Sequence, residues 1–187
     1  MTAPAIRFVV RPAIRSWGPA AIAVLGCLAL LARQLTAGSM VATAAVGVAG
    51  LVAWPRARVE RRPLRWIVVT SAGMAAFALS LAFGPLAEAP ATALGVAAVT
   101  LAAVSEELFF RRLTFGWVEG RWGAAHAVVV TAALFAIVHV PMYGVAVLPL
   151  DLAAGFVFGW QRWASGGWTA PLVTHVAVNL VHLGWWS

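Results

Sequence analysis

The residues best suited to chemistry in this sequence are two adjacent carboxylates inside an apolar run. Glu106 and Glu107 lie within residues 91–117, and ionisable side chains inside an apolar membrane helix are costly enough to indicate function. Neighbouring residues of a helix point about 100° apart, so the two carboxylates cannot face one point. Arg111 follows Glu107 by four residues, which favours an ion pair on one helix face. Glu106 is then the candidate for general base or acid work.

Two further apolar runs carry imidazole side chains. Phe135 is followed four residues later by His139, and His175 is followed four residues later by Asn179. Residues four apart lie one above the other on a helix face. A carboxylate pair by itself also fits a purely structural Glu–Arg ion pair, but a carboxylate pair together with two imidazoles and an amide indicates one site. We therefore predict a catalytic site composed of Glu106, Glu107, Arg111, His139, His175 and Asn179.

Depth in the membrane tests whether these groups can meet. With a rise of about 1.5 Å per residue, Glu106 lies roughly 17 Å from the cytoplasmic end of its helix if that helix ends at Trp117. The same estimate puts His139 at about 24 Å. Contact between Glu106 and His139 would therefore require helix tilt or unequal insertion of the two helices.

The elements that must position these residues are predicted to be membrane helices. Of the 187 residues, 63% are hydrophobic and only 10% are charged, against about 25% charged in soluble domains. Helices are expected because an open sheet edge cannot be satisfied in lipid. We predict an all-α polytopic bundle of about seven transmembrane helices, at residues 17–32, 38–54, 66–83, 91–117, 123–140, 145–163 and 168–185. Pro141 is expected to end or kink the fifth helix.

Charge patterning predicts the orientation. The net charge is +7, and all basic residues are Arg. A basic chain can indicate nucleic-acid binding, but these arginines gather in alternate connections between apolar runs, which indicates topology and no nucleic-acid partner. The N-terminus is therefore predicted to be cytoplasmic, with Arg111, Arg112 and Arg121 counted in the fourth connection. We expect one membrane domain over residues 1–187, with accessory helices in 1–90 and a catalytic core in 91–187.

The motifs resemble those of the CPBP family, the CAAX proteases and bacteriocin-processing enzymes, also called Abi proteins. The family's EExxxR, FxxxH and HxxxN/D motifs match Glu106-Glu107-xxx-Arg111, Phe135-xxx-His139 and His175-xxx-Asn179, in the same order. The resemblance covers residues 91–182. It implies an intramembrane endopeptidase in a multi-pass prokaryotic cell membrane protein, acting on a membrane-anchored peptide or protein within the lipid bilayer.

The resemblance also implies roles for the residues. Glu106 and His139 would activate a water, His175 and Asn179 would stabilise the oxyanion, and Glu107 and Arg111 would hold the shape of the site. Phe135 and His182 are predicted to line the substrate cavity. We expect no cofactor and favour a glutamate mechanism. Zinc is the alternative, with Glu106, His139 and His175 as its ligands.

The sequence also fits other functions. A non-catalytic immunity or scaffold protein of the same family is the main alternative function, and a proton-coupled transporter is disfavoured because no inverted repeat is evident. Asp151, just after Pro149, is expected in the first turn of a helix, where a carboxylate complements the helix N-terminus.

Overall fold

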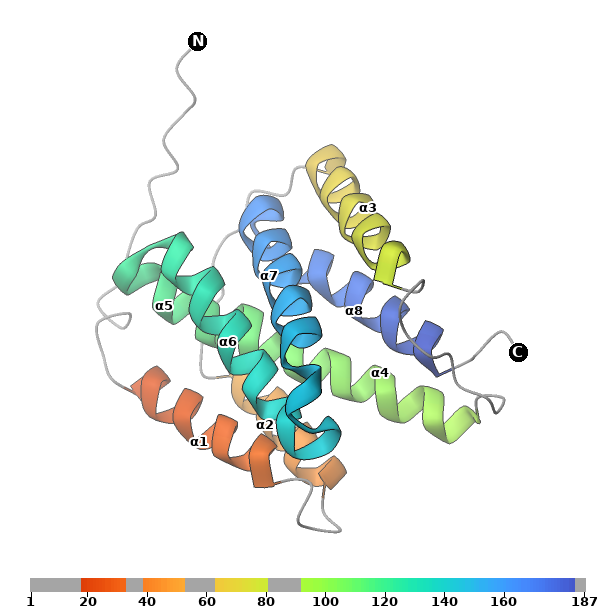
Figure 1. Ribbon diagram of the computed structural model, residues 1–187. Coiled ribbons are helices and arrows are strands. Elements are labelled where there is room, and N and C mark those ends of the chain that lie inside the picture. The colour runs from red at the N-terminus through yellow and green to blue at the C-terminus, as the bar shows by residue number, and fades with distance from the viewer. Residues whose placement is uncertain (1–17, 33–38, 53–62, 81–91, 184–187) are drawn as a thin grey trace.

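The described chain is entirely helical. The computed structural model describes residues 18–32, 39–52, 63–80 and 92–183, and within them no strand occurs. The helices are α1 (Gly18–Ala32), α2 (Ser39–Val52), α3 (Pro63–Ser80), α4 (Ala93–Glu107), α5 (Phe115–Trp122), α6 (Ala124–Tyr143), α7 (Leu148–Ser165) and α8 (Thr169–His182) (Figure 1). A π-helical segment, Leu108–Thr114, joins α4 to α5, so that Ala93–Trp122 is one continuous helix. The all-α prediction is confirmed.

The continuous helix α4–α5 runs through the middle of the bundle (Figure 1). Helix α2 packs against α4 and the π-helical segment, and α1 packs against α2 and that segment. Helices α6 and α7 pack against each other, while α8 packs against α4, α3 and α7. The first motif therefore lies on the central helix. The second and third motifs lie on α6 and α8, which both pack against the central helix and against α7.

Glycines allow the helices to approach closely around the central helix. A Cβ atom built on Gly50 of α2 would lie 2.5 Å from the backbone of Leu108. A Cβ atom on Gly155 of α7 would lie 2.7 Å from Cα of Ala132 in α6. Small residues at helix interfaces are typical of membrane bundles, because van der Waals packing holds those helices together.

The outer faces of the helices are apolar. Large hydrophobic side chains are exposed on several helices, among them Leu25, Val41, Val68, Leu94 and Val129. By length and composition, two helices in the described ranges can cross a membrane: Ala93–Trp122 and Ala124–Tyr143. The apolar helices Gly18–Ala32, Met40–Val52 and Arg65–Ala78 are shorter. The count of seven spans and the cytoplasmic N-terminus stay predictions, and the first 17 residues lie outside the described chain.

Several predicted helix ends were wrong. The fourth helix does not end at Trp117 but continues to Trp122, and Gly123, with a positive φ of 88°, makes the turn into α6. Helix α6 contains Pro141 and ends only at Tyr143, before Gly144 with φ of 79°. A proline near the C-terminal end of a helix interior removes one hydrogen bond but does not prevent the final turn.

The assignment of Arg111 and Arg112 to a connection was also wrong. Both residues lie inside the continuous helix, in the π-helical segment. Arg111 is fully buried, and the Arg112 guanidinium donates to the carbonyls of Gly50 and Leu51 at the C-terminal end of α2. Their charges therefore satisfy partners within the bundle and carry no information on which side of the membrane they lie.

The close approach of α6 and α7 gives a first prediction. Replacing Gly155 with Ala forces a methyl group onto the Ala132 backbone, and we expect a loss of about 1–3 kcal/mol in the free energy of unfolding. Gly95→Ala is the matched control, because its added methyl would meet only side-chain atoms, the nearest 3.2 Å away. Denaturant titration of the purified protein in detergent micelles measures both. An equal effect of the two substitutions would contradict the close packing.

Candidate active site

A fully buried ion pair lies at the centre of the site. Nη1 of Arg111 is 3.3 Å from Oε1 of Glu107, and neither side chain has exposed surface. The same carboxylate oxygen accepts a hydrogen bond from Nδ1 of His175 at 2.9 Å. Because a carboxylate only accepts, Nδ1 of His175 carries the proton and Nε2 points to the other side of the ring. Glu107 thus joins the central helix to α8 and fixes the orientation of His175.

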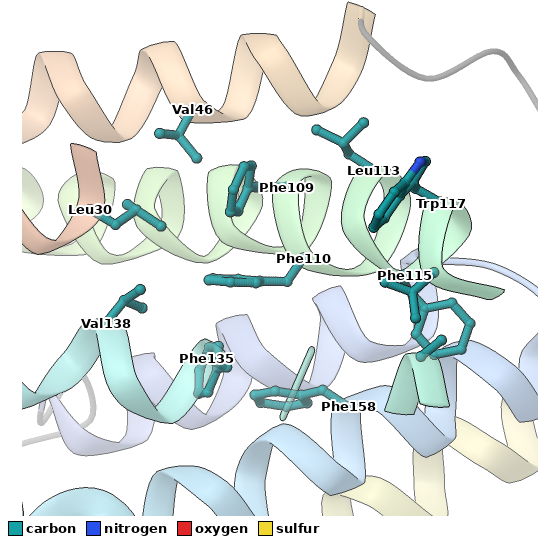
Figure 2. Packing of buried hydrophobic residues seen from close by; sticks show 12 residues of the cluster. Leu30, Val46, Phe109, Phe110, Leu113, Phe115, Trp117, Phe135, Val138 and Phe158 are labelled. Carbon is teal, nitrogen blue, oxygen red and sulfur yellow. The ribbon is translucent and has the colours of Figure 1, made fainter. Parts of the chain in front are cut away.

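Aromatic rings enclose the Arg111 guanidinium. Its Cζ lies 4.7 Å from the ring centroid of Phe135, 5.0 Å from that of Phe158 and 5.6 Å from that of Phe110. Phe110, Phe135 and Phe158 face one another from the π-helical segment, α6 and α7 (Figure 2). Cation–π attraction is stronger in a dry environment, and here it supplements a single carboxylate partner.

Glu106 lies on another side of the central helix and faces both imidazoles. Its Oε2 is 3.7 Å from Nε2 of His139 and 4.0 Å from Nε2 of His175. The Glu106 and His139 side chains are only 3% and 10% exposed. These distances exceed a direct hydrogen bond, but one water molecule can contact all three atoms. The geometry therefore suits a carboxylate and two imidazoles acting on one small reactant.

The tautomer of His139 follows from its own helix. Nδ1 of His139 lies 2.7 Å from the carbonyl oxygen of Phe135, one turn earlier in α6. A carbonyl oxygen only accepts, so Nδ1 is the donor and the lone pair of neutral His139 is on Nε2, facing Glu106. Both imidazoles therefore present Nε2 to the same carboxylate oxygen.

Glu106 and His139 lie at the same depth because the central helix is longer than predicted. Glu106 lies sixteen residues before Trp122, the last residue of α5, and His139 lies sixteen residues after Gly123. Two antiparallel helices leaving one tight turn reach the same depth after equal numbers of residues. The expected requirement for tilt or unequal insertion was wrong, and its cause was the helix end placed at Trp117.

The other predicted site residues take different positions. The Phe135 ring is buried against the rings of His139 and His175, at centroid distances of 4.6 and 5.6 Å. Nδ2 of Asn179 donates to the carbonyl of Val99 at 3.5 Å, one turn of α8 beyond His175. His182 is half-buried, and its Nδ1 bonds to Val178 within its own helix. Asn179 as an oxyanion donor, and Phe135 and His182 as substrate-cavity residues, stay predictions.

Two contacts were missed from the sequence, one inside the site and one beside it. Asp151 does lie in the first turn of α7, as expected, but the described side chains include no cap hydrogen bond for that helix. Its Oδ2 is instead 3.8 Å from Nδ1 of His139. Arg162 of α7 donates from Nε to the carbonyl of Arg111 at 2.9 Å and lies 3.8 Å from Glu119. The spacing from His139 to Asp151 crosses a helix end, so no helical periodicity relates the two residues.

The zinc alternative concerns Glu106, His139 and His175. Within the described ranges, no group of three or more His, Cys, Asp or Glu side chains is arranged to hold a metal ion. These three residues nevertheless bring suitable donor atoms together, with Oε2 of Glu106 at 3.7 and 4.0 Å from the two Nε2 atoms. A mechanism without a cofactor and the zinc alternative both stay predictions.

Fold and site together define an all-helical protein with apolar helices and a buried acid–base cluster. The family described as Type II CAAX prenyl endopeptidase Rce1-like matches residues 88–181, half of the chain. The chain belongs to this family, which confirms the predicted CAAX protease relationship and supports a CAAX protease-type enzyme. The match contains all six predicted catalytic residues, whereas His182 falls just beyond it. No curated protein and no solved structure gives a significant match.

The buried ion pair gives a second prediction. Arg111→Met leaves the Glu107 charge without its guanidinium, and breaking a buried pair in this way costs about 3–5 kcal/mol of unfolding free energy. Combining it with Glu107→Gln removes the uncompensated charge, so the double variant should be more stable than Arg111→Met alone. Denaturant titration in micelles compares Arg111→Met, Glu107→Gln and the double variant. A double variant no more stable than Arg111→Met would contradict charge compensation as the reason for the pair.

Proposed function

We propose that the protein is an intramembrane endopeptidase that hydrolyses a peptide bond of a membrane-anchored protein or peptide. The observation that carries the proposal is the shared approach of two imidazole Nε2 atoms to Oε2 of Glu106, at 3.7 and 4.0 Å. Hydrolysis of an amide needs a base for the water and donors for the developing oxyanion. A carboxylate and two oriented imidazoles supply those groups.

Water activation falls to Glu106 and His139. A water placed between them donates its two protons to Oε2 and Nε2, which directs an oxygen lone pair toward the substrate carbonyl carbon. As the new C–O bond forms, one proton passes to this acceptor pair. When the C–N bond breaks, the pair returns the proton to the leaving nitrogen, so that Glu106 and His139 end in their starting states.

His175 and Asn179 are assigned to the oxyanion. His175 can donate from Nε2 only as an imidazolium, since its Nδ1 proton is already directed to Glu107. The Glu107 carboxylate stabilises that positive charge, and Arg111 keeps the carboxylate in place. Donors held in this way need no rearrangement as negative charge develops on the substrate oxygen. Asn179 would complete the donor set on the same face of α8.

The family name directs the choice of substrate. A peptide that ends in a prenylated Cys-aliphatic-aliphatic-X sequence is anchored in lipid by its prenyl group, which brings the scissile bond to the membrane. The apolar outer faces of the helices suit a substrate that arrives through the bilayer. No nucleic-acid partner and no metal cofactor are part of the proposal.

The first test compares two histidines of α6. His139→Ala and Glu106→Gln should each lower cleavage of an internally quenched, prenylated Cys-aliphatic-aliphatic-X peptide by about 100-fold or more. His126→Ala is the matched control. His126 also bonds through Nδ1 to the carbonyl four residues earlier, at 2.8 Å, but it is exposed.

The readout is the rate of fluorescence increase with purified protein in detergent micelles, with folding checked by gel filtration. His126→Ala should retain the wild-type rate. Retained cleavage in both Glu106→Gln and His139→Ala would remove these two residues from the mechanism. Absence of cleavage by the folded wild-type protein would remove the protease assignment, and the non-catalytic scaffold would then be the better account.

Chelation separates the two proposed chemistries. We expect cleavage of the same peptide to be unchanged after incubation with 1,10-phenanthroline and after dialysis against EDTA, because the mechanism uses no metal. Restoration of lost activity by added Zn²⁺ would instead support Glu106, His139 and His175 as ligands. A parallel incubation with a non-chelating phenanthroline isomer controls for inhibition by the aromatic compound itself.

A further inference from the structure

Asp151 is a half-buried carboxylate for which the proposed mechanism has no use. It lies in the first turn of α7, four residues before Gly155, whose carbonyl accepts from Arg111 at 3.5 Å. The N-cap residue of α7 is Val147, and the helix has no side-chain cap hydrogen bond. Oδ2 of Asp151 is buried and makes no hydrogen bond within the part of the chain that the structure describes. Helix capping therefore does not account for its inward position.

His139 is the group that Asp151 faces. Oδ2 of Asp151 lies 3.8 Å from Nδ1 of His139, and the Asp151 side chain is only 16% exposed. On the other side of the ring, Nε2 faces Glu106. The imidazole is thus flanked by carboxylates from α7 and α4, while its faces meet the rings of Phe135 and Tyr143, at centroid distances of 4.6 and 6.0 Å.

A proton that His139 takes up during the reaction gains electrostatic stabilisation from this arrangement. Neutral His139 carries its proton on Nδ1, which bonds to Phe135, so a second proton can only enter at Nε2. The resulting positive charge lies between the carboxyl groups of Glu106 and Asp151, in a setting of low dielectric constant where attraction at about 4 Å is much stronger than in water.

We propose that Asp151 is a positioning residue that stabilises His139 as an imidazolium, so that His139 carries the proton from the attacking water to the leaving nitrogen. This proposal rests on the proposed hydrolysis and specifies where its proton resides. The water loses one proton to Nε2 while its oxygen bonds to the carbonyl carbon. The C–N bond then breaks as Nε2 gives that proton to the departing nitrogen, and no other reactant is needed.

Asp151→Asn is the discriminating variant, because it keeps the shape of the side chain and removes only its charge. We expect kcat for the prenylated peptide to fall roughly 10- to 100-fold, with KM changed less than about twofold, since the interaction acts on the proton transfer and not on substrate binding. Asp151→Glu retains a carboxylate and should recover most of the loss. Glu119→Gln is the matched charge-removal control, since Glu119 lies 3.8 Å from Arg162 and is 19% exposed.

Each outcome decides the proposal. A wild-type kcat in Asp151→Asn overturns the proposal. An equal loss of kcat in Asp151→Asn and Asp151→Glu, accompanied by a rise in KM, indicates a structural role and also overturns it. Failure of the wild-type protein to cleave the peptide would count against the proposed function alone. In that case the ring ¹⁵N signals of histidine-labelled protein still test the contact. The His139 signals should move in Asp151→Asn and stay in place in Glu119→Gln, and unmoved signals in Asp151→Asn overturn the proposal.

Discussion

A guanidinium group with no exposed surface is stable in an apolar bundle only where carboxylate, carbonyl and aromatic partners surround it. Arg111 meets this condition through Glu107, the Gly155 carbonyl and the faces of three phenylalanine rings. Those partners come from the central helix, α6 and α7. Glu107 in turn holds His175 of α8. The compensation of one buried charge therefore fixes the relative positions of the helices that carry the three motifs.

The π-helical segment carries Arg111, the cation of this buried pair. Within it the backbone N–H of Phe115 bonds to the carbonyl of Phe110, five residues earlier, so the helix is wider than an α-helix. The carbonyl of Arg111 instead accepts from Nε of Arg162. Isolated π-helical turns inside α-helices occur frequently at functional sites. Phe109 of this segment faces Gly26 of α1, whereas Phe110 faces Phe135 of α6 (Figure 2).

The two imidazoles have similar surroundings but different partners. Each has its Nδ1 proton committed to an acceptor and its Nε2 directed to Glu106. For His175 the acceptor is a carboxylate that is shared with Arg111, whereas for His139 it is a backbone carbonyl. Glu107 is shared between Arg111 and His175, while Oδ2 of Asp151 lies 3.8 Å from Nδ1 of His139. This difference is consistent with one imidazole serving as an oxyanion donor and the other as a proton carrier.

The sequence alone determined the helical class, the approximate helix positions, the Glu107–Arg111 pair and the family motifs, because helical periodicity relates residues that lie three or four apart. The Phe135–His139 and His175–Asn179 spacings are local in the same way. Only the tertiary structure decided that Glu106 and His139 lie at one depth, because this depends on a helix ending at Trp122 and not at Trp117. The contact between Asp151 and His139 and the π-helical turn likewise arise from packing between helices, which no spacing along a single helix encodes.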